Sequence, residues 1–125
     1  MRGVGAALLL AVTCMPTGLF AQSLQLEGTW GNPTGCKYAK DGNYEHDDMV
    51  VLKPDGIETY VTLCEWVQAL PSSSGAQVVT GLCGHEGEDY QTVEMYIIEK
   101  DHTDPGLMRV RQSTGEVLSE VRKCP

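Results

Sequence analysis

Cysteines are the residues whose number and spacing say most about possible chemistry. The 125-residue sequence contains Cys14 near its start, followed by Cys36, Cys64, Cys83 and Cys124. Structural zinc sites made from cysteines use short Cys-x-x-Cys spacings, and this sequence has none. If Cys14 is removed with a leader peptide, an even number remains, which is typical of a protein that forms disulfides in an oxidising compartment. We therefore expect two disulfides.

Turn geometry favours one of the three possible pairings of four cysteines. Residues that face each other in an antiparallel hairpin have numbers with a constant sum. If the Ser-rich segment 71–76 is a turn, this rule places Cys64 opposite Cys83, at the separation that a disulfide requires. Cys36 would then bond to Cys124 and fasten the first strand to the last. Regular alternation along the last strand places Cys124 on the opposite face from Val117 and Val121. This opposes the second bond unless the strand bulges or frays near Cys124.

An acidic segment, residues 41–48, could offer oxygen ligands to calcium. An EF-hand loop in this frame would need glycine where His46 stands and a bidentate glutamate where Leu52 stands. We interpret the segment as a solvated loop with a turn at its start.

A second polar segment, residues 84–89, places His85 with Glu86 and Glu88 between two expected strands. A zincin motif would need a second histidine four positions after His85, where Asp89 stands. Glu86 and Glu88 could form an acid and base pair, but we interpret them as exposed turn residues. The same interpretation applies to His102, Asp101 and Asp104.

No serine lies in a nucleophile-elbow motif, and disulfide-bonded cysteines are not available for Cys and His catalysis. We predict that the protein is not an enzyme and has no catalytic, cofactor-binding or metal-binding residues. The basic residues of the last two strands are interpreted as partners for nearby acids: Arg109, Arg111, Arg122 and Lys123.

The first 21 residues resemble a secretory signal peptide. Arg2 supplies a positive start, an apolar run covers residues 4–12, and cleavage is expected between Ala21 and Gln22. A transmembrane anchor would need about 20 apolar residues, and a lipoprotein at Cys14 would need a smaller residue than Thr13 before it. We expect a signal peptide over 1–21, a single disulfide-bonded domain over 22–125, no membrane anchor, and a periplasmic or extracellular location.

The charge of the mature part is strongly negative. Removing the leader takes away Arg2 and no acid, which leaves eight basic against 17 acidic residues and a net charge of −9. Such a surface disfavours nucleic acid and anionic membranes as partners and steers cationic proteins toward it. The same charge would also serve solubility alone.

Short runs of β-forming residues between turn signals predict an all-β domain. The expected strands cover 24–30, 49–53, 57–67, 77–83, 90–99, 107–112 and 116–124, the third running on toward Pro71, and no segment predicts a confident helix. About seven strands joined in sequence suggest an antiparallel meander that forms a small barrel or half barrel. The expected core includes Val93, Met95 and Ile97, with Trp30 and Trp66 as its large members.

The sequence resembles a loose set of small uncharacterised periplasmic proteins of proteobacteria. The matching features are the Leu-x-Gly-x-Trp start at residues 26–30, the four cysteines, the Cys-x-x-Glu-Gly segment at 83–87 and the closing Arg-Lys-Cys. This set has no assigned activity that the resemblance could imply.

Two further resemblances imply alternative functions. The Gly28-Thr29-Trp30 start is similar to the first strand of lipocalin-like barrels, which implies a carrier of a small apolar ligand near Trp30 and Trp66. The chain is short for such a barrel, so a filled interior is expected. Ser74-Gly75 at a hairpin tip is similar to the inhibitory loop of periplasmic lysozyme inhibitors, although Val78 replaces the tyrosine that follows that pair.

The sequence therefore predicts a secreted or periplasmic non-enzymatic β-module with an unknown binding or structural role. One alternative is an inhibitor of a cationic hydrolase such as lysozyme, acting through residues 73–77, with Ser73, Ser74 and Gly75 as the partner-binding loop. The other is a small apolar ligand carrier.

Overall fold

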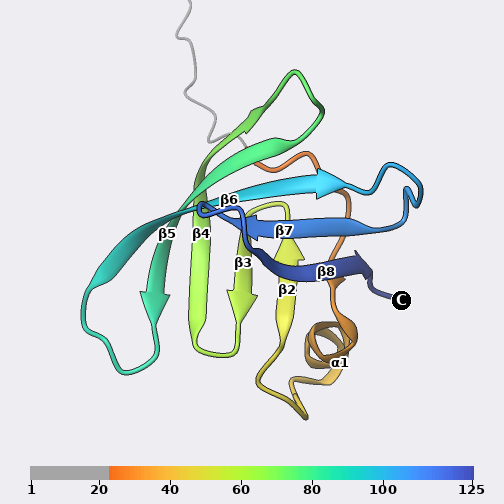
Figure 1. Ribbon diagram of the computed structural model, residues 1–125. Helices are drawn as coiled ribbons and strands as arrows, with labels where there is room; N and C mark the ends of the chain where they lie inside the picture. Colours follow the sequence, from red (N-terminus) through yellow and green to blue (C-terminus); the bar gives the residue numbers. More distant parts are fainter. Residues whose placement is uncertain (1–22) are drawn as a thin grey trace, which may run out of the picture.

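A computed structural model describes residues 23–125, which form a closed antiparallel β-barrel with one helix outside it (Figure 1). The elements are β1 Trp30–Gly31, α1 Pro33–Asp41, β2 Val50–Lys53, β3 Gly56–Thr59, β4 Thr62–Pro71, β5 Gln77–His85, β6 Gln91–Lys100, β7 Met108–Gln112 and β8 Val117–Lys123. Each strand pairs with the next, and β1 pairs with β8 to close the barrel. The all-β prediction is confirmed. The expected signal peptide lies outside the described residues.

Two of the expected strands differ substantially from the structure, whereas the others differ by at most two residues at either end. The strand predicted over 57–67 is two strands, because the chain bends at Tyr60 and Val61 between β3 and β4. The strand predicted over 24–30 is reduced to β1, and Leu24 instead places its side chain in the core while its N–H donates to the Pro54 carbonyl at 2.9 Å. Within residues 23–125 the barrel therefore has eight strands, not seven.

Helix α1 was not predicted, because its ends resemble turns in the sequence. Asn32 is the N-cap, and its Oδ1 accepts hydrogen bonds from the N–H groups of Gly35 at 2.8 Å and Val50 at 3.1 Å. Gly35 allows the helix to approach β2 closely, since a Cβ there would lie 1.9 Å from the Val50 carbonyl oxygen. Gly42 ends the helix with a positive φ of 75°. Residues 32–35 therefore attach α1 to the outside of β2.

The core is filled by side chains from all sides of the barrel. Leu52, Val79, Val110 and Val121 are completely buried, and the rings of Trp66 and Tyr96 meet edge to face with centroids 5.6 Å apart. Among residues 23–125, no helix has the length and apolar character needed to cross a membrane.

The predicted inward face of β6 was wrong. Val93 is 70% exposed and Met95 48% exposed, whereas Tyr96 and Ile98 are buried and Ile97 is half-buried. The inward positions of β6 before Ile98 are Thr92, Glu94 and Tyr96, whose side chains form hydrogen bonds with one another inside the barrel mouth. Apolar alternation indicates the core face only when no polar network occupies that face.

The Cys64–Cys83 disulfide joins β4 to β5 with a Cα–Cα distance of 4.0 Å, as predicted. The register behind that prediction was wrong at the turn, where Pro71 pairs with Gln77 instead of Ala76. A β-bulge at Val67 inserts one residue into β4 and brings Cys64 back opposite Cys83.

The Cys36–Cys124 disulfide is also confirmed, with a Cα–Cα distance of 5.2 Å. Cys36 lies on α1, outside the barrel, and Cys124 follows the last residue of β8. The alternation of β8 is therefore compatible with the bond, because Cys124 turns toward the helix and not toward the core. The N–H of Cys124 also donates to the Thr29 carbonyl at 2.8 Å, beside the pairing of β1 with β8.

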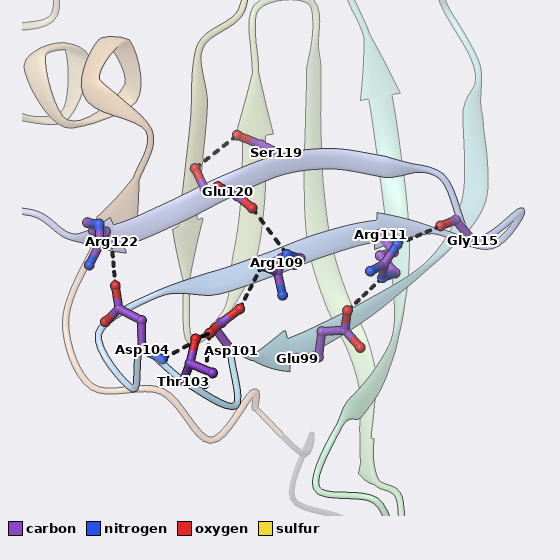
Figure 2. Close-up of polar contacts among 10 residues, drawn as sticks. All are labelled: Glu99, Asp101, Thr103, Asp104, Arg109, Arg111, Gly115, Ser119, Glu120 and Arg122. Atoms are coloured by element: carbon purple, nitrogen blue, oxygen red, sulfur yellow. Dashed lines mark hydrogen bonds and ion pairs between the residues drawn. The ribbon is translucent and has the colours of Figure 1, made fainter.

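Ion pairs cover the outer face of β7 and β8 and the loop that precedes β7 (Figure 2). Arg109 bonds Asp101 at 2.6 Å and Glu120 at 3.1 Å, and Arg111 bonds Glu99 at 2.6 Å. Arg122 bonds Asp104 at 2.5 Å. The predicted pairing of these arginines with nearby acids is confirmed, whereas Lys123 forms no ion pair with residues 23–125.

The Asp101 carboxylate on this face makes the stability of the folded protein depend on pH. This carboxylate accepts hydrogen bonds from the side chain and N–H of Thr103, the N–H of Asp104 and the Arg109 guanidinium, and these hold its pKa well below the ordinary value. A depressed folded-state pKa stabilises the protein above the unfolded-state pKa, and this contribution is lost as pH falls through the folded-state pKa. We expect Asp101→Asn to destabilise the protein at neutral pH and less in strong acid. Urea unfolding at both pH values, with Asp47→Asn as control, measures this, and equal destabilisation at both would contradict it.

Candidate functional site

Three connections gather at one end of the barrel, the lower end in Figure 1: α1 to β2, β3 to β4, and β5 to β6. The rings of Tyr44 and Tyr60 meet edge to face with centroids 5.0 Å apart, and Tyr38 lies 5.8 Å from Tyr44. The Glu86 N–H donates to the Val61 carbonyl at 2.8 Å. These contacts hold the three connections together as one surface.

This surface exposes apolar and aromatic side chains. Tyr44 is 46% exposed, Tyr60 42%, Val61 48% and Leu63 62%. Leu63 points outward from β4, since its neighbour Cys64 points into the core. The exposed side chains therefore run from the loops onto the outer face of β4.

Carboxylates surround these side chains. Glu58 is paired with Leu63 across β3 and β4 and accepts a hydrogen bond of 2.7 Å from the Tyr38 hydroxyl, which raises the pKa of Tyr38. Glu65 follows on β4, and Glu86 adjoins Val61. We call Tyr44, Tyr60, Val61 and Leu63, together with Glu58, Glu65 and Glu86, the tyrosine–glutamate face.

A cavity of about 260 Å³ opens on this face beside Leu63. Glu58 and Glu65 line it together with Lys53 and Asp55, and its apolar lining residues are Val51, Ile57, Leu63 and Cys64, of which Ile57 and Cys64 have their side chains in the core. Gly56 also lines it, and a Cβ there would lie 2.2 Å from the Cys64 carbonyl oxygen. The cavity therefore combines apolar residues with three acids and one lysine.

The carboxylates of this face differ from those of Figure 2 in their partners. Glu99, Asp101, Asp104 and Glu120 each bond an arginine. Within the described part of the chain, Glu58, Glu65 and Glu86 form no ion pair. The negative charge of β3, β4 and their loops is therefore not neutralised in the way that it is on β7 and β8.

A polar cluster lies just inside the same end of the barrel. His85 is hydrogen-bonded to Thr62 at 2.9 Å through Nδ1 and to Thr92 at 2.7 Å through Nε2, and its Nε2 lies 3.3 Å from a carboxylate oxygen of Glu94. The Tyr96 hydroxyl donates to the other oxygen of Glu94 at 2.6 Å. Each member thus has partners within the cluster.

The cluster has the contacts of a structural network that closes the barrel mouth. Glu94 was not predicted as its member. The pattern Thr92-x-Glu94-x-Tyr96 places three polar groups on one side of a strand, and that alternation is the sequence signal that could have identified it.

The sulfurs of Cys64 and Cys83 lie within 4.8 Å of a Glu94 oxygen, as the ligands of a metal ion would. The two sulfurs are bonded to each other, however, so neither is a thiolate that could ligate a metal. The group therefore does not form a metal site while the disulfide is present.

Tyr96 provides a test of the cluster. Burial, together with the hydrogen bond to Glu94, raises the pKa of Tyr96 far above its ordinary value of 10. Because the folded state keeps the proton longer than the unfolded state, the associated stability is fully present below about pH 10 and is lost as pH rises through the folded-state pKa. We expect Tyr96 to be the last tyrosine to ionise in an alkaline titration of phenolate absorbance.

Tyr96→Phe should remove that late step from the titration. Tyr90→Phe, at an exposed position, is the matched control and should leave the late step in place. Ionisation of Tyr96 together with the exposed tyrosines would contradict the hydrogen-bonded cluster.

The other predicted acidic residues lie apart from one another. The segment 41–48 begins at the last residue of α1, where Lys37 pairs with Asp41 at 3.4 Å and lies 3.9 Å from a Glu45 oxygen. Glu86 and Glu88 are exposed in the β5 to β6 turn, and His102 is exposed in the β6 to β7 loop. Their interpretation as loop and turn residues is consistent with these positions.

The predicted partner-binding loop lies at the opposite end of the barrel from the tyrosine–glutamate face. Ser73, Ser74 and Gly75 form the tip of the β4–β5 hairpin, which extends beyond the barrel at the top of Figure 1. The turn is closed by a 2.7 Å hydrogen bond from the Ser72 N–H to the Ala76 carbonyl, and Gly75 has a φ of 88°. A cavity of about 310 Å³ separates this tip from Asp101 and His102.

The protein is a small antiparallel β-barrel that is closed by hydrogen bonds between its first and last strands. One disulfide joins neighbouring strands, and the other joins the outer helix to the C-terminus. Comparison with protein-family models, with curated proteins and with solved structures found no match to this chain.

Proposed function

We propose that this protein is an exported, non-enzymatic binding module that associates with a cationic protein in the periplasm or outside the cell. The two disulfides suggest a non-reducing compartment. The leader pattern and the resemblance to small periplasmic proteins support export. Mass spectrometry of the protein expressed with its own leader should give a mature chain that begins at Gln22, and an intact leader on all of the product would contradict export.

One observation carries the binding role: apolar side chains that would ordinarily be inside are on the outer surface. Leu63 on β4 and Val93 on β6 are the most exposed of them, and Val67 at the bulge is half exposed. Contiguous exposed apolar side chains mark interaction surfaces, and Tyr60, Val61 and Leu63 are exposed within four consecutive residues. The net charge of −9 for the mature chain favours a cationic partner.

The packed interior gives less support to the carrier alternative. Trp66 is buried in the core, whereas Trp30 lies half-buried at the barrel rim and donates from Nε1 to the Glu27 carbonyl at 3.0 Å. The cavity expected near both tryptophans would have to form among completely buried side chains such as Leu52 and Val121.

Lysozyme is a suitable cationic probe for this function. We expect the immobilised mature protein to bind lysozyme with a dissociation constant in the micromolar range at low salt and more weakly as salt is added, because the association is partly electrostatic. Succinylated lysozyme, whose lysines carry carboxylates, is the matched control and should not bind. Absence of lysozyme binding at low salt would overturn the proposed function.

The protruding hairpin favours a second candidate, inhibition of a cationic hydrolase through residues 73–77. Its tip stands clear of the barrel, which is the shape needed to enter an enzyme cleft (Figure 1). A cell-wall lysis assay tests this candidate. Inhibition that is lost in Ser74→Arg would support it, and uninhibited lysis at micromolar protein would end it.

A further inference from the structure

We infer that the tyrosine–glutamate face is the surface that receives the cationic partner, and that an arginine or lysine side chain of the partner enters the cavity between Glu58 and Glu65. This inference rests on the proposed function and names the site and the chemistry of its partner.

The tyrosine–glutamate face has the composition of a protein interface. Tyr44, Tyr60, Val61 and Leu63 are contributed by two loops and the start of β4, and all are substantially exposed. Aromatic side chains are enriched where proteins bind one another, since they bury much area at little entropic cost. The edge-to-face contact of Tyr44 with Tyr60 already holds both rings in place. The partner would therefore not have to order them.

The cavity fits one long cationic side chain. The aliphatic stem of an arginine or lysine can lie on the exposed Leu63 side chain while its charged end lies between the carboxylates of Glu58 and Glu65. Lys53 also lines the cavity, but it forms no ion pair with the described carboxylates. The charged lining residues are therefore three acids, Asp55, Glu58 and Glu65, against one lysine, which leaves the lining net negative.

Charge complementarity favours a basic protein over a second copy of this chain as the occupant of the face. On β7 and β8, arginines of this chain already neutralise the acids (Figure 2). A second copy would present the same carboxylates as Glu58, Glu65 and Glu86, and like charges opposed to one another repel. A basic protein surface is the occupant that satisfies these groups.

Two pairs of variants test the location of the site with lysozyme as the probe. Glu65→Lys should weaken binding by roughly tenfold or more, because it reverses a charge at the cavity wall. Its matched control, Glu116→Lys, makes the same change at an exposed turn on the other side of the barrel and should alter binding by less than about twofold. Leu63→Ser should weaken binding by roughly fivefold, whereas Val117→Ser, at an exposed apolar position on β8, should not.

Chemical-shift mapping of the ¹⁵N-labelled protein with lysozyme provides a readout that does not depend on variants. We expect the largest changes at the amides of Tyr44, Tyr60, Leu63 and Glu86. If lysozyme binds but the shifts gather at the β4–β5 hairpin tip and Glu65→Lys binds normally, this inference is wrong and the proposed function stands. If wild-type protein does not bind lysozyme at all, both are wrong.

Discussion

Replacing Cys36 and Cys124 together by alanine is expected to lower the free energy of unfolding by about 4.6 kcal/mol. The bond spans 88 positions of sequence, so its loss releases a long loop in the unfolded chain. Both cysteines are only half-buried, so the substitution adds little packing loss of its own. Urea unfolding followed by circular dichroism measures the change.

The same experiment separates an unfolded-state effect from damage to the barrel. If the bond acts on the unfolded chain, the variant should keep its native spectrum, and the dependence of stability on urea should be unchanged or steeper. A loss below about 1 kcal/mol would contradict the chain-entropy account. Loss of the native spectrum in water would instead mean that the attachment of α1 is required for folding.

Replacing Trp66 by alanine is expected to cost about 3 to 5 kcal/mol. Its ring packs against Tyr96 and above Gly81, and its Nε1 donates to the Lys53 carbonyl at 3.3 Å. Removing the indole would leave a cavity bounded by strands that two disulfides and a closed sheet prevent from collapsing. Thermal or urea unfolding measures the cost.

Trp66→Phe is the matched control for this substitution. It keeps an aromatic ring next to Tyr96 but loses the hydrogen bond to Lys53, so it should cost less than half as much as alanine. An alanine variant as stable as the wild type would show that the barrel interior is less tightly packed than the burial of Trp66 implies.

The strand pattern and the Cys64–Cys83 disulfide could be predicted because they depend on local signals, and the Cys36–Cys124 disulfide then followed as the remaining pair. The turns at 54–56, 71–76 and 113–115 each stand between runs of β-forming residues, and each separates adjacent strands in the structure. The pairing of Cys64 with Cys83 was correct although its register was not, because the displaced turn and the bulge at Val67 offset each other. A bulge leaves no mark in the sequence that alternation alone could detect.

Helix α1 and the face of β6 could not be predicted, because distant partners determine both. In the sequence Asn32 and Gly35 resemble turn residues. Their helical role becomes visible only in the structure, where the Val50 N–H donates to Asn32 and the Val50 carbonyl lies against Gly35. Val93 and Met95 resemble core residues until His85 and Tyr96 are found to hold Glu94 inside. The tyrosine–glutamate face was missed for the same reason, since its members come from segments that only the barrel brings together.

The two disulfides are nested, because the loop closed by Cys64 and Cys83 lies wholly within the loop closed by Cys36 and Cys124. A protease that cuts the exposed turn at residues 72–75 would therefore leave two fragments joined by both bonds. A cut between Cys36 and Cys64, or between Cys83 and Cys124, would leave them joined by one. The protein can thus be cut once between Cys36 and Cys124 and still keep its full mass until a reductant breaks the disulfides.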